Sequence, residues 1–260
     1  MDGGAIVASA VVQSSDSAEA SARTALDQAL AKAGPDGDVY VVSTGAGGKA
    51  VSFSRQSRAI TTCLARGVHF LLPQSRTAID MGAETITVVR INERGRVSDY
   101  GNQDKCAAGT GIFLQQMARV LRLSMDEMSG AAAGARGRVE ITGTCAVFAE
   151  SEVISHIHRD PPTPVEDIVA GIYRSMVNRV MAQLQRLGVK REVAVTGGVA
   201  ASRGLVGILE QEIGRILGEE AGRILGEEAG RLLVPPSPEL SGAIGAAVIA
   251  GENIMQEGAG

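Results

Sequence analysis

The chain has 260 residues, which is enough for one large domain or two small lobes with a sizeable core. Its formal net charge is −4 and it has no dense run of Lys or Arg, so we expect no nucleic-acid partner. It has no apolar run of the ~18 residues that a membrane span needs, no basic start of a secretory signal, and only three cysteines, so we expect a cytoplasmic protein away from membranes.

In chain order, the pattern first predicts a strand over 5–13 and then a helix that begins at a serine and ends near Gly34. A buried strand over 38–45 runs into a glycine loop, and residues 54–72 have helical spacing. Residues 76–101 read as two strands joined by the turn sequence "NERG". These segments alternate in the way that is typical of an α/β fold.

The second half of the chain continues the alternation. The pattern predicts a helix over 111–121, a strand, turn and helix over 138–159, and a long amphipathic helix that ends at Gly188. A strand and glycine turn over 192–202, a further helix, and an Ala/Gly-rich closing helix follow. We predict a first lobe of residues 1–77 completed by about 243–260, and a second lobe of residues 78–242.

The octapeptide "GRILGEEA" occurs at 214–221 and again at 222–229. Eight residues advance a helix by about two turns plus ~80°, so an Ile-Leu stripe would drift around the surface. The repeat therefore indicates an extended helix or surface loop, with a binding surface as the alternative.

The sequence "STGAGGKAVS" at 43–52 is similar to a phosphate-binding P-loop but departs from it. Position 43 is Ser where the pattern needs Gly, and Ala50 stands where Ser or Thr should follow the Lys. We interpret the segment as a tight structural turn.

Asp80 ends a buried apolar run and is followed by Gly82. A carboxylate there could hold waters around Mg²⁺, and backbone N–H groups beside a small residue can approach a phosphate. A hairpin turn capped by the aspartate explains the residues equally well. "VTGG" at 195–198 is a second strand end where a ligand could lie on the backbone at a helix N-terminus.

Cys106 and Cys145 each precede a predicted helix, where the positive helix end favours a thiolate. Two cysteines cannot ligate a [4Fe–4S] cluster, which takes four, but a symmetric dimer could supply two from each chain. The alternative is two buried structural thiols. We predict that Cys63 is simply buried, and that His156 and His158 are surface or capping residues rather than metal ligands.

Taken together, "IDMGAET", "KCAAGTG", "TCAVFAESEVIS", "TGGVA" and "SGAIGAAVIA" resemble, in this order, the ATP-dependent electron activators. These are the activators of 2-hydroxyacyl-CoA dehydratases and the homologous ATPase subunits of benzoyl-CoA reductases. The resemblance covers roughly residues 38 to 250. It implies an actin-like (ASKHA, ribonuclease H-like) ATPase fold of two lobes with ATP and Mg²⁺ between them.

The resemblance also implies an electron-transfer function and its site. Cys106 and Cys145 would hold a [4Fe–4S] cluster with the same residues of a homologous or identical subunit across a two-fold axis. A ferredoxin-like donor would reduce the cluster, and ATP hydrolysis would drive its electron to an acyl-CoA reductase or dehydratase component. Asp80 would be the catalytic residue, and the cofactor-binding residues would be Gly82, Ala83, Glu84, Gly109, Thr110, Gly111, Gly197, Gly198 and Val199.

Two departures from the family pattern bear on this expectation. "GAET" replaces the usual Gly-Gly-Gln-Asp run, which fits a diverged benzoyl-CoA reductase subunit. The family's first strand and first phosphate loop have no counterpart here, which suggests a late start codon or an impaired ATPase. The alternatives are a sugar or acyl kinase of the same fold and a non-catalytic partner subunit. The acyl-CoA substrate belongs to another polypeptide, and the dimer could be homomeric or heteromeric.

Overall fold

The computed structural model describes residues 1–34, 37–103, 110–143, 145–221 and 232–257. The chain divides into two compact units. Unit 1 comprises Met1–Gln74, Ile91–Ser98 and Leu240–Gly260, and unit 2 comprises Ser75–Arg90 and Asp99–Glu239.

Unit 1 combines helices with a two-stranded parallel sheet. Its elements are α1 (Ala18–Ala33), β1 (Val42–Thr44), the 3-10 turn η1 (Gly48–Ala50), β2 (Gln56–Arg58), α2 (Ile60–Leu71) and α8 (Ser241–Glu257). The predicted first helix is confirmed, because the Ser17 hydroxyl caps its start and Gly34 ends it in the left-handed conformation. The predicted strand over 5–13 is wrong, since only an isolated bridge from Asp2 to Ala5 forms there.

Helices α2 and α8 pack against each other through glycines. A side chain on Gly67 would clash with the carbonyl oxygen of Ser241, and one on Gly245 with that of Cys63. Cys63 is fully buried, as predicted. The two backbones can therefore approach closely only while both positions lack a Cβ. The start of the predicted helix at 54–72 is corrected, because β2 occupies its first residues.

Unit 2 contains a five-stranded sheet in the order β5-β4-β3-β6-β7. Its strands are β3 (Thr77–Met81), β4 (Ile86–Ile91), β5 (Val97–Gln103), β6 (Val193–Thr196) and β7 (Leu232–Leu233). Strand β3 pairs antiparallel with β4 and parallel with β6, and β6 pairs parallel with β7. Three strands replace the two predicted over 76–101, because a turn at 82–85 divides the first run.

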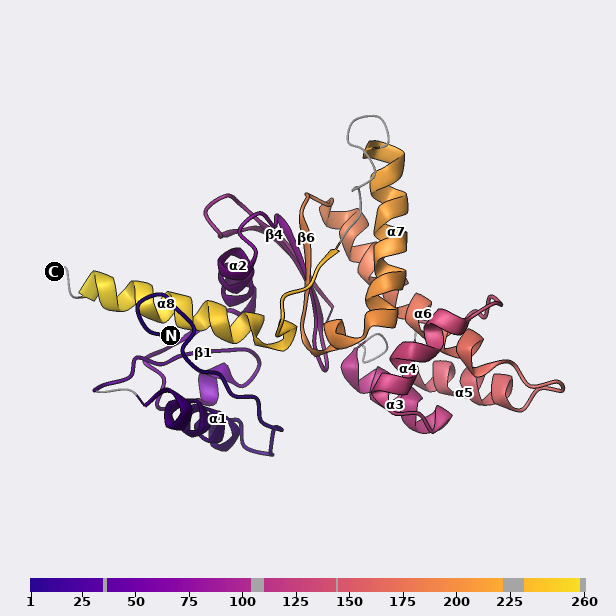
Figure 1. The fold of residues 1–260 in the computed structure, drawn as a ribbon, viewed down its shortest axis with the longest axis horizontal. Helices are drawn as coiled ribbons and strands as arrows, with labels where there is room; N and C mark the ends of the chain where they lie inside the picture. The colour runs from indigo at the N-terminus through magenta and orange to yellow at the C-terminus, as the bar shows by residue number, and fades with distance from the viewer. Residues whose placement is uncertain (35–36, 104–109, 144, 222–231, 258–260) are drawn as a thin grey trace. The chain divides into compact units, whose positions relative to one another are not determined.

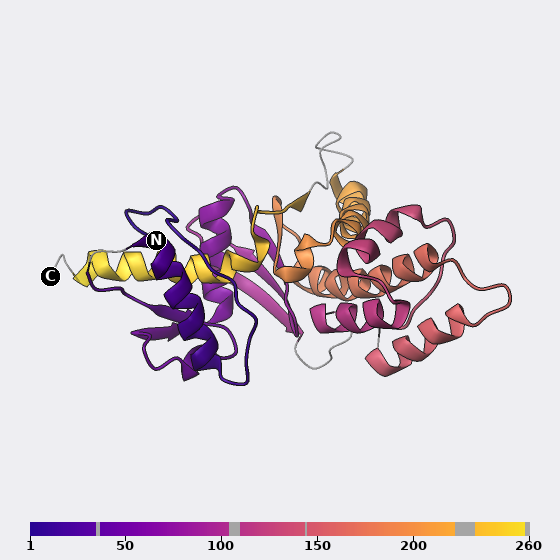
Figure 2. The ribbon, with the colours of Figure 1, turned by 60° about the horizontal axis from the view of Figure 1, so that its bottom comes forward.

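The helices of unit 2 lie together on one side of this sheet (Figures 1 and 2). They are α3 (Gly111–Leu121), α4 (Met125–Ala131), α5 (Ala146–Ile157), α6 (Val165–Leu187) and α7 (Arg203–Ala221), with 3-10 turns η2 (Ala132–Gly134) and η3 (Gly198–Ala201). Buried apolar residues from these helices and from β3, β4 and β6 form one core. Tyr173 of α6 is its largest fully buried side chain, and its hydroxyl accepts a hydrogen bond from Ser202 at 3.0 Å.

Several expected elements differ in detail. Residues 138–143 form no strand, although Val139 and Ile141 are buried in the core. Helix α4 was not predicted, even though Ser124 and Glu127 form a capping box at its start. The first "GRILGEEA" copy completes α7, and the second falls outside the described residues. None of the described helices has the length and apolar character that a membrane crossing needs.

Candidate functional site

The carboxyl ends of β3 and β6 bring Asp80 and Thr196 together. The two residues are directly paired across the parallel strands, and the Thr196 hydroxyl donates a hydrogen bond to the Asp80 carboxylate at 2.9 Å. Burial raises the pKa of Asp80, and the Thr196 hydrogen bond partly offsets that rise. The carboxylate is thus held in a fixed position inside protein while keeping some exposure at the strand end.

A row of polar side chains extends from Asp80 across the sheet. Thr87 of β4 stands opposite Asp80, so the two side chains share a face. The Thr87 hydroxyl donates to the side-chain oxygen of Asn102 at 3.1 Å, and Asn102 is exposed. Sequence reasoning missed Asn102, Thr87 and Thr196. Thr196 is a polar residue at the end of an apolar strand, and this signal becomes informative only once the strand order is known.

The turn after Asp80 supports the start of helix α3. The amide of Gly82 donates to the Thr85 carbonyl at 2.9 Å and closes the turn. The amides of Gly111 and Ile112 then donate to the carbonyls of Gly82 and Ala83, each at 2.9 Å. The first N–H groups of a helix have no hydrogen-bond acceptor within the helix. At the start of α3, two of these groups donate to carbonyls of the 82–85 turn instead.

Close packing at Gly111 joins three of the predicted segments. A Cβ at this position would lie 3.2 Å from the Ala83 Cα, 3.3 Å from the Gly82 oxygen and 3.4 Å from a Val199 methyl. Thr110, the residue before it, is buried at the N-cap position of α3. A methyl group at this position would therefore force the helix or the 82–85 turn to shift by a few tenths of an ångström.

The glycine turn after β6 is built around Gly197. This residue has φ +84°, and a side chain on it would clash with the Met81 carbonyl. Its amide donates to the Pro238 carbonyl at 3.0 Å. Gly198 is exposed with open space where a Cβ would point, whereas Val199 is buried. Of residues 197–199, Gly198 is therefore the exposed one that a ligand could approach.

The structure brings most of the residues predicted to bind nucleotide to the carboxyl ends of the neighbouring strands β3 and β6. Ligands bind at the carboxyl ends of the strands in sheets with parallel strands. Asp80, Gly82, Ala83, Gly111, Gly197 and Val199 lie within one continuous set of contacts. Ala83 and Glu84 are exposed at the tip of the turn. Gly109 and Cys106 lie outside the described residues.

Cys145 is the N-cap residue of α5 and is a free, partly exposed thiol. Three residues earlier, the Thr142 amide donates a hydrogen bond to the carboxylate of Glu152 in the same helix at 2.6 Å. Val147 and Phe148 in the first turn are 69% and 65% exposed, so Cys145 lies beside an uncovered apolar surface. Within the described ranges, no three Cys, His, Asp or Glu side chains are grouped as a metal site.

His156 differs from the surface position predicted for it. Its side chain is buried, and its Nδ1 lies 3.1 Å from the Thr163 hydroxyl. Desolvation by burial lowers the pKa of His156, and the positive charge of the nearby Arg159 lowers it further. The negative charge of Glu152 raises this pKa and offsets part of the change. His158 is exposed at the end of α5, in agreement with the prediction.

The mixed five-stranded sheet and the helices packed against it define an α/β class of protein, and comparison with known proteins makes the class specific. The model of the BadF/BadG/BcrA/BcrD ATPase family matches residues 2–250. The chain belongs to this family.

Individual relatives agree with that assignment. The chain is 39% identical to the 2-hydroxyisocaproyl-CoA dehydratase activator of Clostridioides difficile over 210 residues, which are 81% of this chain and 73% of the relative. It is 36% identical over 259 residues to the activator of lactoyl-CoA dehydratase of Anaerotignum propionicum, covering 96% and 91% of the two chains.

Solved structures confirm the fold class predicted from the sequence. The activator of the 2-hydroxyisocaproyl-CoA dehydratase from Clostridium difficile, with bound ADPNP, superposes with a TM-score of 0.82 at 35% identity, over 94% of this chain and 86% of that one. A ROK family glucokinase from Streptomyces griseus shares the fold, with a TM-score of 0.53 at 14% identity, over 97% and 94% of the chains.

Proposed function

We propose that this chain is the ATP-hydrolysing activator of an acyl-CoA dehydratase or a related acyl-CoA reductase. The observation that carries the proposal is the fixed Asp80 carboxylate beside Gly82, Ala83 and Gly198 at one sheet edge. Activators of dehydratases are the relatives it matches over most of its length, and one of them was solved with an ATP analogue bound.

Asp80 is the proposed catalytic residue. Its carboxylate accepts a hydrogen bond from the Thr196 hydroxyl, and among the described residues it forms no ion pair with a cationic side chain. A single carboxylate near phosphate oxygens and water suits Mg²⁺, which keeps several waters when bound. Asp80 would orient one such water, and the exposed backbone of Ala83, Glu84 and Gly198 would contact the nucleotide.

Helix α3 would connect the nucleotide to the second predicted site. Its first two amides are bonded to the 82–85 turn, so displacement of that turn by a bound phosphate would also displace the helix start. Cys106 lies five residues before Gly111 in the sequence. Coupling between two sites requires an element whose position both of them bias, and α3 meets that requirement.

Cys145 fits the role of a cluster ligand. It is a partly exposed thiol at the start of a helix of 12 residues, where the helix dipole favours a thiolate. Cys106 and Cys145 of two chains would provide the four thiolates of a [4Fe–4S] cluster. Such a cluster supplies one-electron transfer at low potential. The exposed Val147 and Phe148 suit contact with a second homologous or identical subunit at this face.

The proposed partners are a ferredoxin-like donor and a dehydratase or reductase component that receives the electron. We further propose that units 1 and 2 correspond to the two lobes expected from the sequence.

The experiment that tests the proposed cluster is iron analysis and visible spectroscopy of anaerobically purified protein. Wild type should contain about four iron atoms per dimer, and Cys145→Ala should contain none, whereas Cys63→Ala should retain the cluster.

Absence of iron from wild-type protein would contradict the cluster, and so would a normal cluster in Cys145→Ala. If the iron-free protein instead transferred phosphate from ATP to a sugar or an acyl group, it would be a kinase of the same fold.

A further inference from the structure

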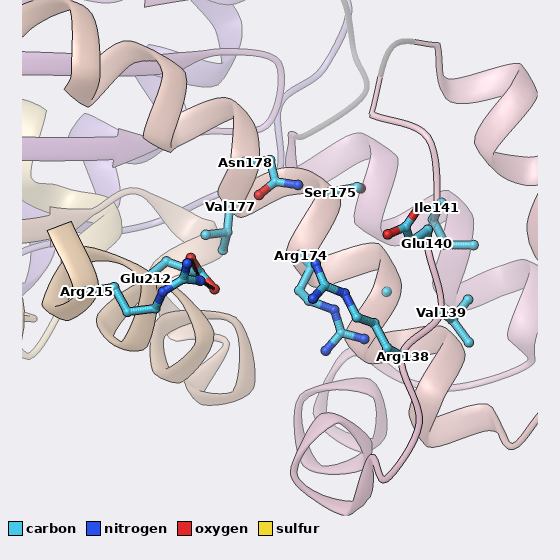
Figure 3. A pocket seen from close by; sticks show the side chains of 11 residues that line it. Arg138, Val139, Glu140, Ile141, Arg174, Ser175, Val177, Asn178, Glu212 and Arg215 are labelled. Atoms are coloured by element: carbon cyan, nitrogen blue, oxygen red, sulfur yellow. Dashed lines mark hydrogen bonds and ion pairs between the residues drawn. The ribbon is translucent and has the colours of Figure 1, made fainter.

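A pocket lies in unit 2 and is lined by residues other than those of the two proposed sites. It has a volume of about 370 Å³ and is formed by the 138–141 segment, helix α6 and helix α7 (Figure 3). Its lining includes no residue of the 82–85 turn, the 197–199 turn or the Cys145 junction. The volume falls in the range typical of small-molecule sites.

The 138–141 segment contributes both apolar and charged residues to this pocket. Val139 and Ile141 are buried in the apolar core, whereas Arg138 and Glu140 are exposed, and all four line the pocket. Arg174 of α6 also lines the pocket, and in the view of Figure 3 its side chain and that of Arg138 extend toward one another. Two cationic groups from separate segments therefore share one space.

Neither of these two arginines forms an ion pair among the described residues, although Glu140 lines the same pocket. Glu212 of α7 is engaged by Arg215, with nitrogen and oxygen 2.9 Å apart. No such ion pair joins Arg138 or Arg174 to a carboxylate in the part of the chain that the structure describes. One terminal nitrogen of Arg174 is also buried without a hydrogen-bond acceptor. A buried donor left unsatisfied, next to a like charge, is unfavourable unless an anion completes the site.

We propose that this pocket binds a small molecule through a compact oxyanion, a phosphate or carboxylate group held between Arg138 and Arg174. The planar guanidinium donates two parallel hydrogen bonds to such groups, which an ammonium cannot do. The side-chain amide of Asn178 lies in the same lining and can contact a polar part of the ligand. The pocket would then be an effector site, distinct from the proposed nucleotide site.

The test measures binding of inorganic phosphate and of succinate to the full chain by calorimetry, at constant ionic strength set with sodium chloride. The phosphate arm and the succinate arm distinguish the two oxyanions. Wild type should bind at least one of them saturably, and Arg174→Gln and Arg138→Gln should each bind about tenfold more weakly or not at all.

A further variant serves as the control. Arg159→Gln removes an exposed arginine outside the pocket, so it should bind as wild type does. Because Arg138 is exposed, its variant decides the result should Arg174→Gln not fold. Absence of saturable binding by wild type overturns the proposal. Binding that survives both arginine changes, or that is weakened equally in Arg159→Gln, overturns it as well.

Discussion

The amide of Gly111 donates a hydrogen bond to the carbonyl of Gly82 at 2.9 Å, so the start of α3 is bonded directly to the turn after Asp80. The next amide, of Ile112, repeats the contact on Ala83. A helix start normally leaves such donors to caps or water. Here they fix the position of α3 on the turn that we assign to the nucleotide phosphates.

Replacement of Gly111 by alanine should weaken that attachment. The new Cβ would lie 3.2 Å from the Ala83 backbone, so the helix or the turn must shift by a few tenths of an ångström. We expect a loss of about 1 kcal/mol in the free energy of unfolding, measured in urea, together with slower ATP hydrolysis. Gly130→Ala in α4 is the matched control, because a Cβ there meets open space. Equal stability of the two variants would contradict the account of this contact.

Glu152 is expected to hold the backbone at Thr142 near the start of the helix that begins after Cys145. Its carboxylate accepts the Thr142 amide at 2.6 Å, and Glu152→Gln replaces a charge-assisted hydrogen bond by a neutral one. We expect iron to be lost from this variant faster than from wild type when a chelator is added. Glu150→Gln, on the same helix but bonded to Gln116 at 3.4 Å, should lose iron at the wild-type rate. Identical rates for all three proteins would show that Glu152 has no such role.

Helices α2 and α8 should not tolerate a methyl group at their crossing. Gly245→Ala places a Cβ against the Cys63 carbonyl, and we expect a loss of about 2–4 kcal/mol in the free energy of unfolding. Gly251→Ala lies on the same helix with open space around it and should be neutral or slightly stabilising, since Ala favours helix by up to ~1 kcal/mol. Circular dichroism during urea unfolding measures both, and unchanged stability of Gly245→Ala would be inconsistent with the close approach.

Stability should fall at mildly acidic pH because of His156. Its pKa is lowered in the folded state, so below the ordinary value near 6.5 the unfolded chain binds the additional proton. The contribution of neutral His156 to the free energy of unfolding is therefore fully present above about pH 6.5, and it is lost as the pH falls towards the lowered pKa. His156→Gln should flatten this part of the curve of unfolding free energy against pH between about 7.5 and 5.5. His158→Gln, at an exposed position, should leave the slope as it is in wild type.

Local signals predicted several elements well. Ser17 and Gly34 define the ends of α1, and α3 begins and ends where its apolar spacing indicates. The strand expected over 5–13 had an apolar pattern but finds no partner strand among the described residues, and a strand is stable only when it is paired. The strand propensity of residues 5–13 alone could not reveal that no partner strand would pair with them.

The candidate site was predicted in part. The motifs located Asp80, Gly82 and Gly197, because glycines beside strand ends are visible in the sequence. Thr196 could not be identified, since its contact with Asp80 joins residues 116 positions apart and depends on the register of β3 and β6. The burial of His156 likewise depends on packing between segments.

The central claim is that Asp80 serves ATP hydrolysis in an electron activator, and the rate of ADP release by anaerobically purified protein tests it most directly. Wild type should hydrolyse ATP in a Mg²⁺-dependent reaction, and Asp80→Asn, which preserves shape and removes the charge, should be slower by about a hundredfold or more. Asp126→Asn, at an exposed position of α4, should hydrolyse ATP at the wild-type rate. An Asp80→Asn variant that hydrolyses ATP as fast as wild type would contradict the account.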